Sequence, residues 1–420
     1  MSELNYLEKL LDGVEVEWLP LGVLGELVRG NGLPKTDFTE AGIPAIHYGQ
    51  IYTFYGLSTE TTKSFVSQDT AKKLKKVNTG DVVITNTSEN LDDVGKALVY
   101  LGKEQAVTGG HATIFKPNKG IIGKYFAYFT QTNSFFNEKR KYSKGTKVID
   151  VSASDMAKIT IPIPCPNNPE KSLAIQSEIV RILDEFTALT AELTAELTAR
   201  KKQYNYYRDQ LFSFDEGEVE WKTLGEIAKI QRGASPRPIA QYMTDADDGI
   251  PWIKIGDTSP DSKYINGTAQ KVTPDGAKKS RILNPGDFVI SNSMSFGRPY
   301  ILSITGAIHD GWASISDFSE RLDSDYLYHY LSSQRVKNYW GSKINSGSVS
   351  NLNADIIKTL PLPLPDIQKQ KWIATLLDKF DTLTSSISEG IPREIELRQK
   401  QYEYYRDLLF SFPKSEAASN

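Results

Sequence analysis

The stretch Gln203–Phe214, which reads Gln-Tyr-Asn-Tyr-Tyr-Arg-Asp-Gln-Leu-Phe-Ser-Phe, returns at Gln401–Phe412 as Gln-Tyr-Glu-Tyr-Tyr-Arg-Asp-Leu-Leu-Phe-Ser-Phe. Ten of the twelve positions are identical. A long-period repeat of this kind decides the fold, because it means that the chain contains one unit twice. Each unit spans roughly 200 of the 420 residues.

Further anchors of the repeat lie upstream of each copy of this stretch. The matched pairs are Glu15–Trp18 with Glu218–Trp221, Arg29-Gly30 with Arg232-Gly233, Gly42–Ile46 with Gly249–Ile253, Gly80–Asn86 with Gly286–Asn292, and Ile161–Pro164 with Leu360–Pro363. Between these anchors the two copies differ freely. The sequence therefore predicts a shared framework that carries two different sets of loops.

The first part of each unit predicts an α+β fold. Short β-branched runs alternate with Gly, Asn and Pro, a pattern typical of strands and turns. The runs 82–84 and 288–290 predict buried strands, and the aromatic-rich segments 125–140 and 326–340 have the length of helices.

The last part of each unit predicts a long helix with an apolar seam. Apolar residues recur at alternating spacings of three and four, a pattern typical of a coiled coil. They are Ile175, Ile179, Ile182, Phe186, Leu189 and Leu193 in the first copy, and Ile373, Leu376, Phe380, Leu383 and Ile387 in the second. The simplest partner for each helix is the other, and the proline runs before them would supply their starts. The alternative is a helix packed on its own domain. A restart at Gly390-Ile391-Pro392 is also expected.

A shorter repeat lies within the first helix. The tetrad Leu-Thr-Ala-Glu or Leu-Thr-Ala-Arg begins at Leu189, Leu193 and Leu197. Each tetrad adds about 6 Å and a net turn of about 40° to a helix. This array is either a spacer that sets the separation and rotation of the two domains, or ordinary helix-forming sequence.

Composition excludes several classes of protein. The chain has no apolar run of about 18 to 20 residues that would span a membrane, and its single cysteine, Cys165, excludes an internal disulfide. No phosphate-binding glycine motif is present, and the four histidines lack metal-ligand spacing. The pattern indicates a cytoplasmic protein without a catalytic centre. The net charge of −3 does not by itself indicate a nucleic-acid partner.

Together these features resemble the specificity subunit of type I restriction–modification enzymes. The resemblance covers nearly the whole chain and rests on the tandem variable domains, the Pro-x-Pro runs, and a Gln-x-x-Ile-x-x-x-Leu-Asp pattern at Gln176–Asp184 and Gln370–Asp378. The tetrad array and the Tyr-Tyr-Arg-Asp blocks look most like the subfamily called type IC.

The resemblance implies a division of labour along the chain. Residues 1–164 and 217–363 would be target recognition domains, each reading one half of a bipartite, asymmetric site in double-stranded DNA. Residues 165–216 and 364–414 would form an antiparallel coiled coil that sets the gap between the half-sites.

The resemblance also implies partners. Two modification (methyltransferase) subunits would dock on the helical regions, and restriction subunits that translocate DNA would join them. S-adenosylmethionine, ATP and magnesium would belong to those partners, and this chain would bind no cofactor and catalyse nothing. Candidate docking residues are Tyr204, Tyr207, Arg208, Tyr402, Tyr405 and Arg406.

Basic side chains at equivalent places in the two copies suit contact with DNA phosphates, which fixes register without reading sequence. They are Lys139, Arg140, Lys141, Lys144 and Lys147 in the first copy and Arg335, Lys337 and Lys343 in the second. The alternative is a solvated, charged helix end.

Base-reading candidates are polar residues in the loops that follow shared strands. They are Asn31, Lys35, Asn86, Thr87, Ser88 and Asn90 in the first copy and Ser235, Arg237, Asn292, Ser293, Ser295 and Arg298 in the second. Two competing classes are a self-contained restriction–methyltransferase enzyme, whose motifs the sequence lacks, and a scaffold protein, whose DNA binding would show no sequence preference or salt dependence.

Overall fold

The structure of the chain is a computed structural model. It describes residues 10, 13–259, 262–292, 297–318, 320–345, 352–386 and 388–412. It forms two compact units, one of Met1–Ala191 with Leu397–Asn420 and the other of Glu192–Glu396. Both dividing points lie inside helices, and the C-terminal repeat block belongs to the first unit.

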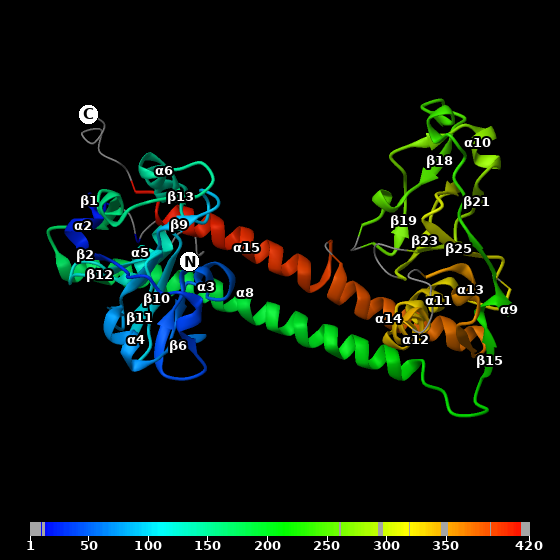
Figure 1. The fold of residues 1–420 in the computed structure, drawn as a ribbon, viewed down its shortest axis with the longest axis horizontal. Helices are drawn as coiled ribbons and strands as arrows, with labels where there is room; N and C mark the ends of the chain where they lie inside the picture. Colours follow the sequence, from blue (N-terminus) through cyan, green and yellow to red (C-terminus); the bar gives the residue numbers. More distant parts are fainter. Residues whose placement is uncertain are drawn as a thin grey trace. The chain divides into compact units, whose positions relative to one another are not determined.

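The first unit contains two five-stranded sheets and two strand pairs (Figure 1). The sheets run in the order β2-β12-β8-β10-β5 and β3-β6-β4-β11-β7, and the pairs are β1-β14 and β13-β9. The strands are β1 (Val16–Pro20), β2 (Gly25–Arg29), β3 (Phe38–Thr39), β4 (Ile43–Ile46), β5 (Ser58–Thr59), β6 (Ser64–Val66), β7 (Lys75–Val77), β8 (Val82–Thr85), β9 (Thr87–Ser88), β10 (Ala97–Tyr100), β11 (Ala106–Thr108), β12 (Ala112–Pro117), β13 (Ile149–Asp150) and β14 (Thr160–Pro164). The helices are α2 (Leu21–Leu24), η1 (Lys35–Asp37), α3 (Tyr48–Thr53), α4 (Gln68–Lys73), α5 (Gly123–Phe129), α6 (Asn133–Tyr142), α7 (Ala153–Met156) and the start of α8 (Pro169–Leu211).

The second unit repeats the order of both five-stranded sheets and the pair β1-β14, whereas the pair β13-β9 has no counterpart among its described residues. Its sheets run β16-β25-β22-β23-β19 and β17-β20-β18-β24-β21, with the pair β15-β26. The strands are β15 (Glu220–Thr223), β16 (Lys229–Arg232), β17 (Met243–Thr244), β18 (Ile250–Ile253), β19 (Tyr264–Ile265), β20 (Lys271–Val272), β21 (Arg281–Leu283), β22 (Phe288–Ser291), β23 (Pro299–Leu302), β24 (Gly306–Ile308), β25 (Trp312–Ser316) and β26 (Pro361–Leu364). The helices are α9 (Leu224–Ile227), η2 (Ile239–Gln241), η3 (Ile255–Asp257), α10 (Pro274–Lys278), α11 (Ser324–Leu331), α12 (Gln334–Asn345), α13 (Ala354–Lys358), α14 (Ile367–Ser385) and α15 (Gly390–Leu409), the last of which ends in the first unit. The duplicated α+β plan is confirmed.

The shared sequence anchors form the framework of the sheets. The predicted strands at 82–84 and 288–290 are β8 and β22, and every residue of both is buried. Gly30 and Gly233 lie where two chain segments touch. A Cβ added at Gly30 would lie 2.0 Å from the Gly109 carbonyl oxygen, and one added at Gly233 would lie 2.1 Å from the His309 carbonyl oxygen. The Arg-Gly pairs are therefore explained by close backbone approach.

Each predicted aromatic helix is in fact two helices. The first segment breaks between α5 and α6 at Thr132, whose hydroxyl accepts a hydrogen bond from the backbone N–H of Phe135. In the second segment, Ser333 accepts from the N–H of Val336 in the same way. A hydroxyl of this kind favours a new helix start, a local signal that outweighs the aromatic pattern.

The proline runs form strands rather than helix starts. β14 and β26 each pair with one other strand, β1 and β15, and a two-stranded pair tolerates prolines that donate no hydrogen bond. The helix starts lie a few residues later. Asn168 accepts from the N–H of Lys171 before α8, and Asp366 accepts from that of Lys369 before α14.

The long helices pack in both ways that the sequence allows, against their own domain and against each other. Ile175, Ile179 and Ile182 are buried in the core of their own unit, as in the alternative interpretation. Further along α8, Phe186 stacks on Tyr405 of α15 with ring centroids 5.2 Å apart.

In the second unit, the end of α8 packs against α14, where Tyr204 stacks on Phe380 at 6.2 Å. This order of contacts along α8 is that of an antiparallel helix pair. The predicted restart separates α14 from α15, although Ile387 lies outside the described residues. Within the described ranges, no helix combines the length and apolar character needed to cross a membrane.

Candidate functional site

In the first unit, candidate residues meet where β2, β8 and β12 end or begin. Thr87 Oγ1 lies 3.0 Å from His111 Nδ1, and the ring of His111 lies 4.8 Å from that of Tyr48. Asn31 forms a β-bridge with Gly109 and donates to the Lys73 carbonyl at 2.6 Å. This end of the sheets therefore presents hydroxyl, amide, imidazole and phenol groups side by side.

The predicted loop residues divide into exposed and buried ones. Asn31, Lys35 and Asn90 are exposed, and Thr87 and Ser88 are half-buried. Asn86 is wrong as a base-reading residue. It is fully buried, where its amide donates to the Val151 carbonyl at 2.7 Å and accepts from the Thr113 hydroxyl at 2.9 Å. Its carboxamide is occupied in tying β8 to its neighbours.

The equivalent end of the second unit carries different groups. Ser235 Oγ donates to Asp310 Oδ1 at 3.0 Å, and Arg237 forms an ion pair with the same carboxylate at 3.6 Å. His309 Nε2 lies 3.1 Å from Asp310 Oδ1. Asn292 is half-buried, and Ser293 and Ser295 lie outside the described residues. The last candidate, Arg298, lines a cavity described below.

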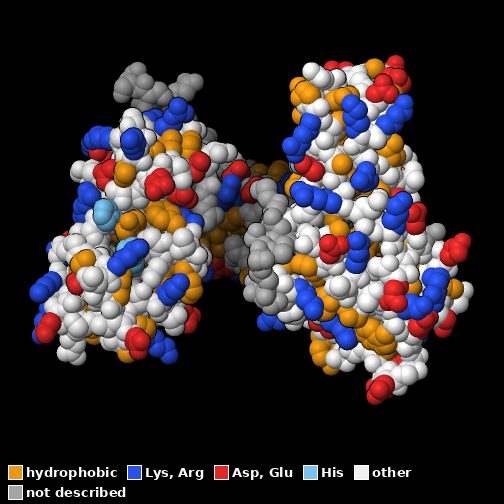
Figure 2. All heavy atoms as spheres, turned by 45° about the vertical axis from the view of Figure 1, so that its right-hand side comes forward, with side chains coloured by type: hydrophobic (Ala, Val, Ile, Leu, Met, Phe, Trp, Pro, Cys, Tyr) orange, Lys and Arg blue, Asp and Glu red, His pale blue; other side chains and the backbone are white. Residues whose placement is uncertain are grey.

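Two residues of the first cluster were missed as base-reading candidates. The sequence favours a structural or contact role for His47 and His111, since the second copy has Lys254 and Trp312 at the aligned positions. In the fold both flank Tyr48, and His47 caps α3 by accepting from the N–H of Gly49. Their positions beside strand ends were the available signal. Figure 2 shows histidine at the surface of this unit among lysine and arginine side chains.

The basic candidates of the first unit also divide. Lys139 is wrong as a phosphate contact, because it is buried and its ammonium donates to the carbonyls of Asp92 and Val94 at 2.9 and 2.7 Å. Burial lowers the pKa of Lys139 to about 8. The other candidates are exposed, and two of them, Lys141 and Lys144, form ion pairs with acidic side chains. The exposed residues are Arg140, Lys141, Lys144 and Lys147.

The basic candidates of the second unit are exposed. Arg335 lies over the ring of Trp221 at 4.9 Å, and Lys343 over that of Tyr339 at 5.5 Å. Lys337 lines the same cavity as Arg298. Exposed cations at these positions suit contacts with phosphates.

The repeated Tyr-Tyr-Arg-Asp blocks anchor the helices within the chain. Phe410 packs on Tyr125 at 5.1 Å in the first unit, and Phe212 packs on Tyr326 at 5.2 Å in the second. The docking prediction is therefore wrong for Tyr204 and Tyr402, which are buried. Burial raises the pKa of Tyr402 to about 12. Arg208 and Arg406 lie over these two rings, and Tyr405 is also largely covered, whereas Tyr207 remains 43 % exposed.

The Gln-x-x-Ile-x-x-x-Leu-Asp pattern joins each helix to its recognition domain. The buried Gln176 accepts from the N–H of Ile122 at 2.9 Å and donates to the carbonyl of Gly120 at 3.0 Å. Gln370 makes the same pair of contacts with Asp323 and Arg321. The glutamine therefore completes the backbone hydrogen bonding at the start of α5 or α11.

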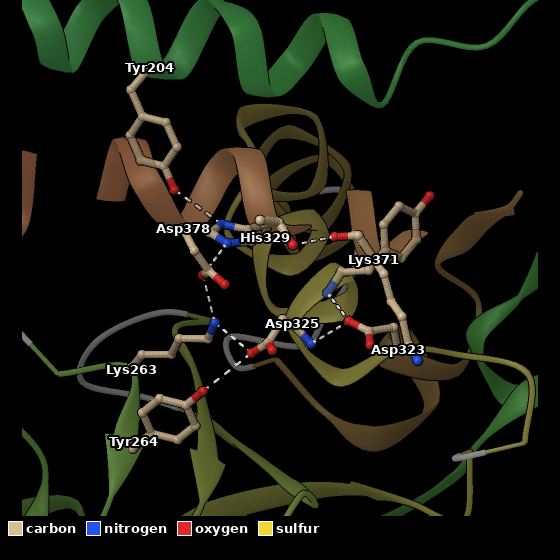
Figure 3. A network of polar contacts seen from close by, with 10 residues as sticks. Tyr204, Lys263, Tyr264, Asp323, Asp325, His329, Lys371 and Asp378 are labelled. Carbon is tan, nitrogen blue, oxygen red and sulfur yellow. Dashed lines mark hydrogen bonds and ion pairs between the residues drawn. The ribbon is translucent and has the colours of Figure 1, made fainter. Parts of the chain in front are cut away.

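The aspartate of the pattern anchors a polar network, shown for the second unit in Figure 3. Asp378 accepts from Lys263 at 2.9 Å and lies 2.8 Å from Nε2 of the fully buried His329. Tyr204 contacts the other ring nitrogen of His329 at 3.1 Å, and Lys263 also pairs with Asp325 at 2.6 Å. Burial opposes ionisation of Asp378, but the hydrogen bonds from His329 and Lys263 outweigh it and hold its pKa at about 2.

No cluster of metal-ligating side chains occurs in the described ranges. The fold and these surfaces define a protein with two copies of one domain. Each copy packs against a long helix and presents its own set of polar groups at the equivalent end of its sheets.

Comparison with known proteins identifies the family. A family model described as "Type I restriction modification DNA specificity domain" matches residues 14–200 and 216–397. The Escherichia coli "Type I restriction enzyme EcoR124I/EcoR124II specificity subunit" is 41% identical over the full length of both chains. The E. coli "Type I restriction enzyme EcoprrI specificity subunit" is 34% identical over 93% of each.

A solved structure from work on complex assembly and conformational transition of the type I restriction–modification system has the same fold. Its TM-score is 0.64 at 15% identity, and the match covers 94% of this chain and 97% of that one. The chain therefore belongs to the type I restriction–modification specificity family.

Proposed function

We propose that the chain is the non-catalytic subunit that gives a type I restriction–modification complex its DNA sequence specificity. Each unit reads one half of a bipartite, asymmetric site. The observation that carries the proposal is the identity of strand order in the two units combined with different side chains at the equivalent sheet end. These side chains are Thr87 and His111 in the first unit, and Ser235, Arg237 and Asp310 in the second unit.

These side chains suit the reading of base edges. Hydroxyl, amide, imidazole and guanidinium groups supply the donors and acceptors that distinguish base pairs in the major groove. The exposed basic residues of the two units, such as Arg140, Lys147 and Arg335, suit phosphate contacts that set register. A framework held constant beneath different reading groups is what recognition of two unlike half-sites requires.

The helices form the spacer in this proposal. The tetrads that begin at Leu189, Leu193 and Leu197 lie within the continuous helix α8. One tetrad turns the helix by a net of about 40°, close to the ~34° of one DNA base pair. The tetrad count would therefore set the gap between the half-sites.

The same helices would dock two modification subunits, with the exposed Tyr207 as a contact. Restriction subunits would join the complex. S-adenosylmethionine, ATP and magnesium would be bound by those partners, with this chain holding no cofactor and performing no catalysis, in the cytoplasm where the DNA lies.

The test is selection of duplexes from a random library by the complex reconstituted with its modification subunits. One double variant, Asn31→Ala with Lys35→Ala, changes the first unit, and Ser235→Ala with Arg237→Ala changes the second. We expect each to relax one half-site by about 1–3 kcal/mol per lost base contact and to leave the other unchanged. Relaxation of neither half-site, or of both by each variant, would contradict the assignment of one half-site to each unit.

A further inference from the structure

The second unit contains a cavity of about 540 Å³ beside the end of α8. Its walls come from α8, from the end of α14, from α11 and α12, and from the residues that lead into β23. Four of its side chains are cationic, namely Lys201, Arg208, Arg298 and Lys337, and one, Asp381, is acidic. The cavity therefore holds an excess of positive charge.

This charge is not neutralised within the part of the chain that the structure describes. None of the four cations forms an ion pair with a described carboxylate. Although the side chain of Lys337 is exposed overall, desolvation at the cavity wall, followed by the nearby guanidinium groups of Arg208 and Arg298, lowers its pKa despite the opposing charge of Asp209. Gathering like charges in a partly desolvated place costs free energy, and a bound anion would offset that cost.

Arg208 is positioned as a rigid donor. Its side chain is only 7 % exposed and lies over the Tyr204 ring at 5.0 Å. One terminal nitrogen donates to Asn205 Oδ1 at 2.7 Å, while the buried Nε–H has no acceptor among the described residues. A buried donor without a partner calls for an explanation, and an oxyanion beside the guanidinium would supply one.

The first unit provides an internal comparison. Its equivalent cavity, of about 410 Å³, is lined by Tyr402 and Arg406 in place of Tyr204 and Arg208, and by Lys96 in place of Arg298.

In this first cavity two of the three cationic side chains already have partners, and Lys96 is the third. Arg406 pairs with Asp407 at 2.8 Å, Lys139 donates to two carbonyls, and two aspartates, Asp92 and Asp93, line the wall. The position of Lys201 is taken by Gln399. The excess of positive charge is therefore larger in the second copy, whose cavity has four cations and one carboxylate, than in the first, whose cavity has three cations and two carboxylates.

We infer that the cavity of the second unit binds one phosphate of the DNA backbone next to the half-site that this unit reads. The inference rests on the proposed function. Identical modification subunits docked equivalently on both units would meet equivalent residues, which these cavities do not offer. Arg298 directly precedes Pro299, which pairs with Ile290 near the end of β22, so this wall of the cavity adjoins the sheet end that presents Ser235 and Asp310 and would face the DNA.

The test uses the complete complex with its modification subunits and a duplex that carries the recognised site. The variants are Arg298→Ala and Lys337→Ala, whose side chains are not fully buried, and the matched control is Lys96→Ala at the first-unit position equivalent to Arg298. Affinity is measured between about 50 and about 200 mM salt, where loss of one phosphate contact lowers the salt slope by about 0.9.

We expect each second-unit variant to lose about tenfold in affinity, equally for specific and nonspecific DNA, and to show the shallower slope. Lys96→Ala should retain the wild-type slope. Inorganic phosphate, added at constant ionic strength, should weaken DNA binding by the wild type more than by a variant that carries both Arg298→Ala and Lys337→Ala.

Three outcomes would overturn the inference. They are an unchanged slope in both variants, an equal loss in Lys96→Ala, and impaired assembly with the modification subunits while assembled complexes bind DNA normally. The last would mean that a carboxylate of the partner protein occupies the cavity. Failure of the proposed function is distinct, since the wild-type complex would then show no sequence preference.

Discussion

Tyr128 donates a 2.6 Å hydrogen bond to Asp184, and at the equivalent place in the second unit His329 meets Asp378 at 2.8 Å. The helix residue is the same in both copies, whereas its partner on the recognition domain is a phenol in one and an imidazole in the other. Each aspartate also pairs with a lysine, Lys124 in the first unit at 2.7 Å. The joint between helix and domain is therefore retained while the residues that make it vary.

Asp378→Asn should weaken this joint in the second unit. The substitution removes the charge that faces Lys263, whose side chain is 10 % exposed, and the fully buried His329. We expect the free energy of unfolding of this unit to fall by about 1–3 kcal/mol. Hydrogen exchange of amides in α11 and α14 reports the change separately from the first unit.

The matched control is Asp275→Asn, since Asp275 forms an exposed ion pair with Lys278 in the same unit. A surface pair of this kind contributes about 0–1 kcal/mol. Equal effects of the two substitutions would show that the Asp378 network does not hold the helix to the domain.

Gln176→Ala should destabilise the first unit. It leaves the N–H of Ile122 and the carbonyl of Gly120 without their partner, and each unsatisfied group costs about 1–3 kcal/mol. We expect a loss of about 2–4 kcal/mol in the stability of this unit, measured by chemical denaturation with hydrogen exchange. Gln176→Glu keeps the acceptor but places a carboxylate at a fully buried position that faces the Gly120 carbonyl, so it should cost at least as much as Gln176→Ala. A loss below about 1 kcal/mol for Gln176→Ala would show that these two hydrogen bonds do not hold α8 to the domain.

The first unit should lose stability as the pH falls from 7 to 5. Burial, with Lys35 and His111 nearby, lowers the pKa of His47 below its ordinary value of 6.5. Below pH 6.5 the unfolded chain therefore binds a proton before the folded one, and stability decreases until the folded-state pKa is reached. His47→Asn retains a side-chain acceptor for the Gly49 N–H and cannot titrate.

Thermal unfolding at several pH values, followed by hydrogen exchange in β4 and β11, measures this effect. The His47→Asn variant should show a smaller loss between pH 7 and pH 5 than the wild type. Superimposable pH profiles for the two proteins would exclude a contribution from His47.

Sequence alone predicts the repeat and the framework because both depend on local patterns. Identical anchors give identical strands, and alternating apolar spacings give the long helices. Burial of polar side chains depends on long-range contacts that no local pattern reveals. Lys139 and Asn86 have the composition of surface residues, yet carbonyls and a hydroxyl from distant segments satisfy them inside the fold.

The sequence also does not predict that the repeated blocks anchor the helices, because this role depends on long-range contacts as well. The stretch at 401–412 follows the second unit in sequence but packs into the first, where Tyr402 and Phe410 join its core. Apolar side chains such as these indicate that something covers them, without indicating whether it belongs to the same chain. Only the fold places Tyr204 and Tyr402 inside.

Insertion of one Leu-Thr-Ala-Glu tetrad after Glu196 should lengthen the gap between the half-sites by about one base pair. The added turn of about 40° is close to the ~34° twist of one base-pair step. A control insertion of the same four residues in the exposed loop after Gly267 should leave the gap unchanged. The recognised sequence is read from duplex selection with the reconstituted complex. An unchanged gap, or altered half-sites, would exclude the spacer role of the array.

The most direct measurement is a map of methylated adenine across the genome of the host, by long-read sequencing, with the gene present and deleted. The account predicts that deletion abolishes methylation at one bipartite motif and leaves other motifs unchanged, and the map then gives both half-sites and their gap. Methylation that is the same in both strains, although the modification subunits are expressed and co-purify with this chain, would contradict its role in DNA specificity.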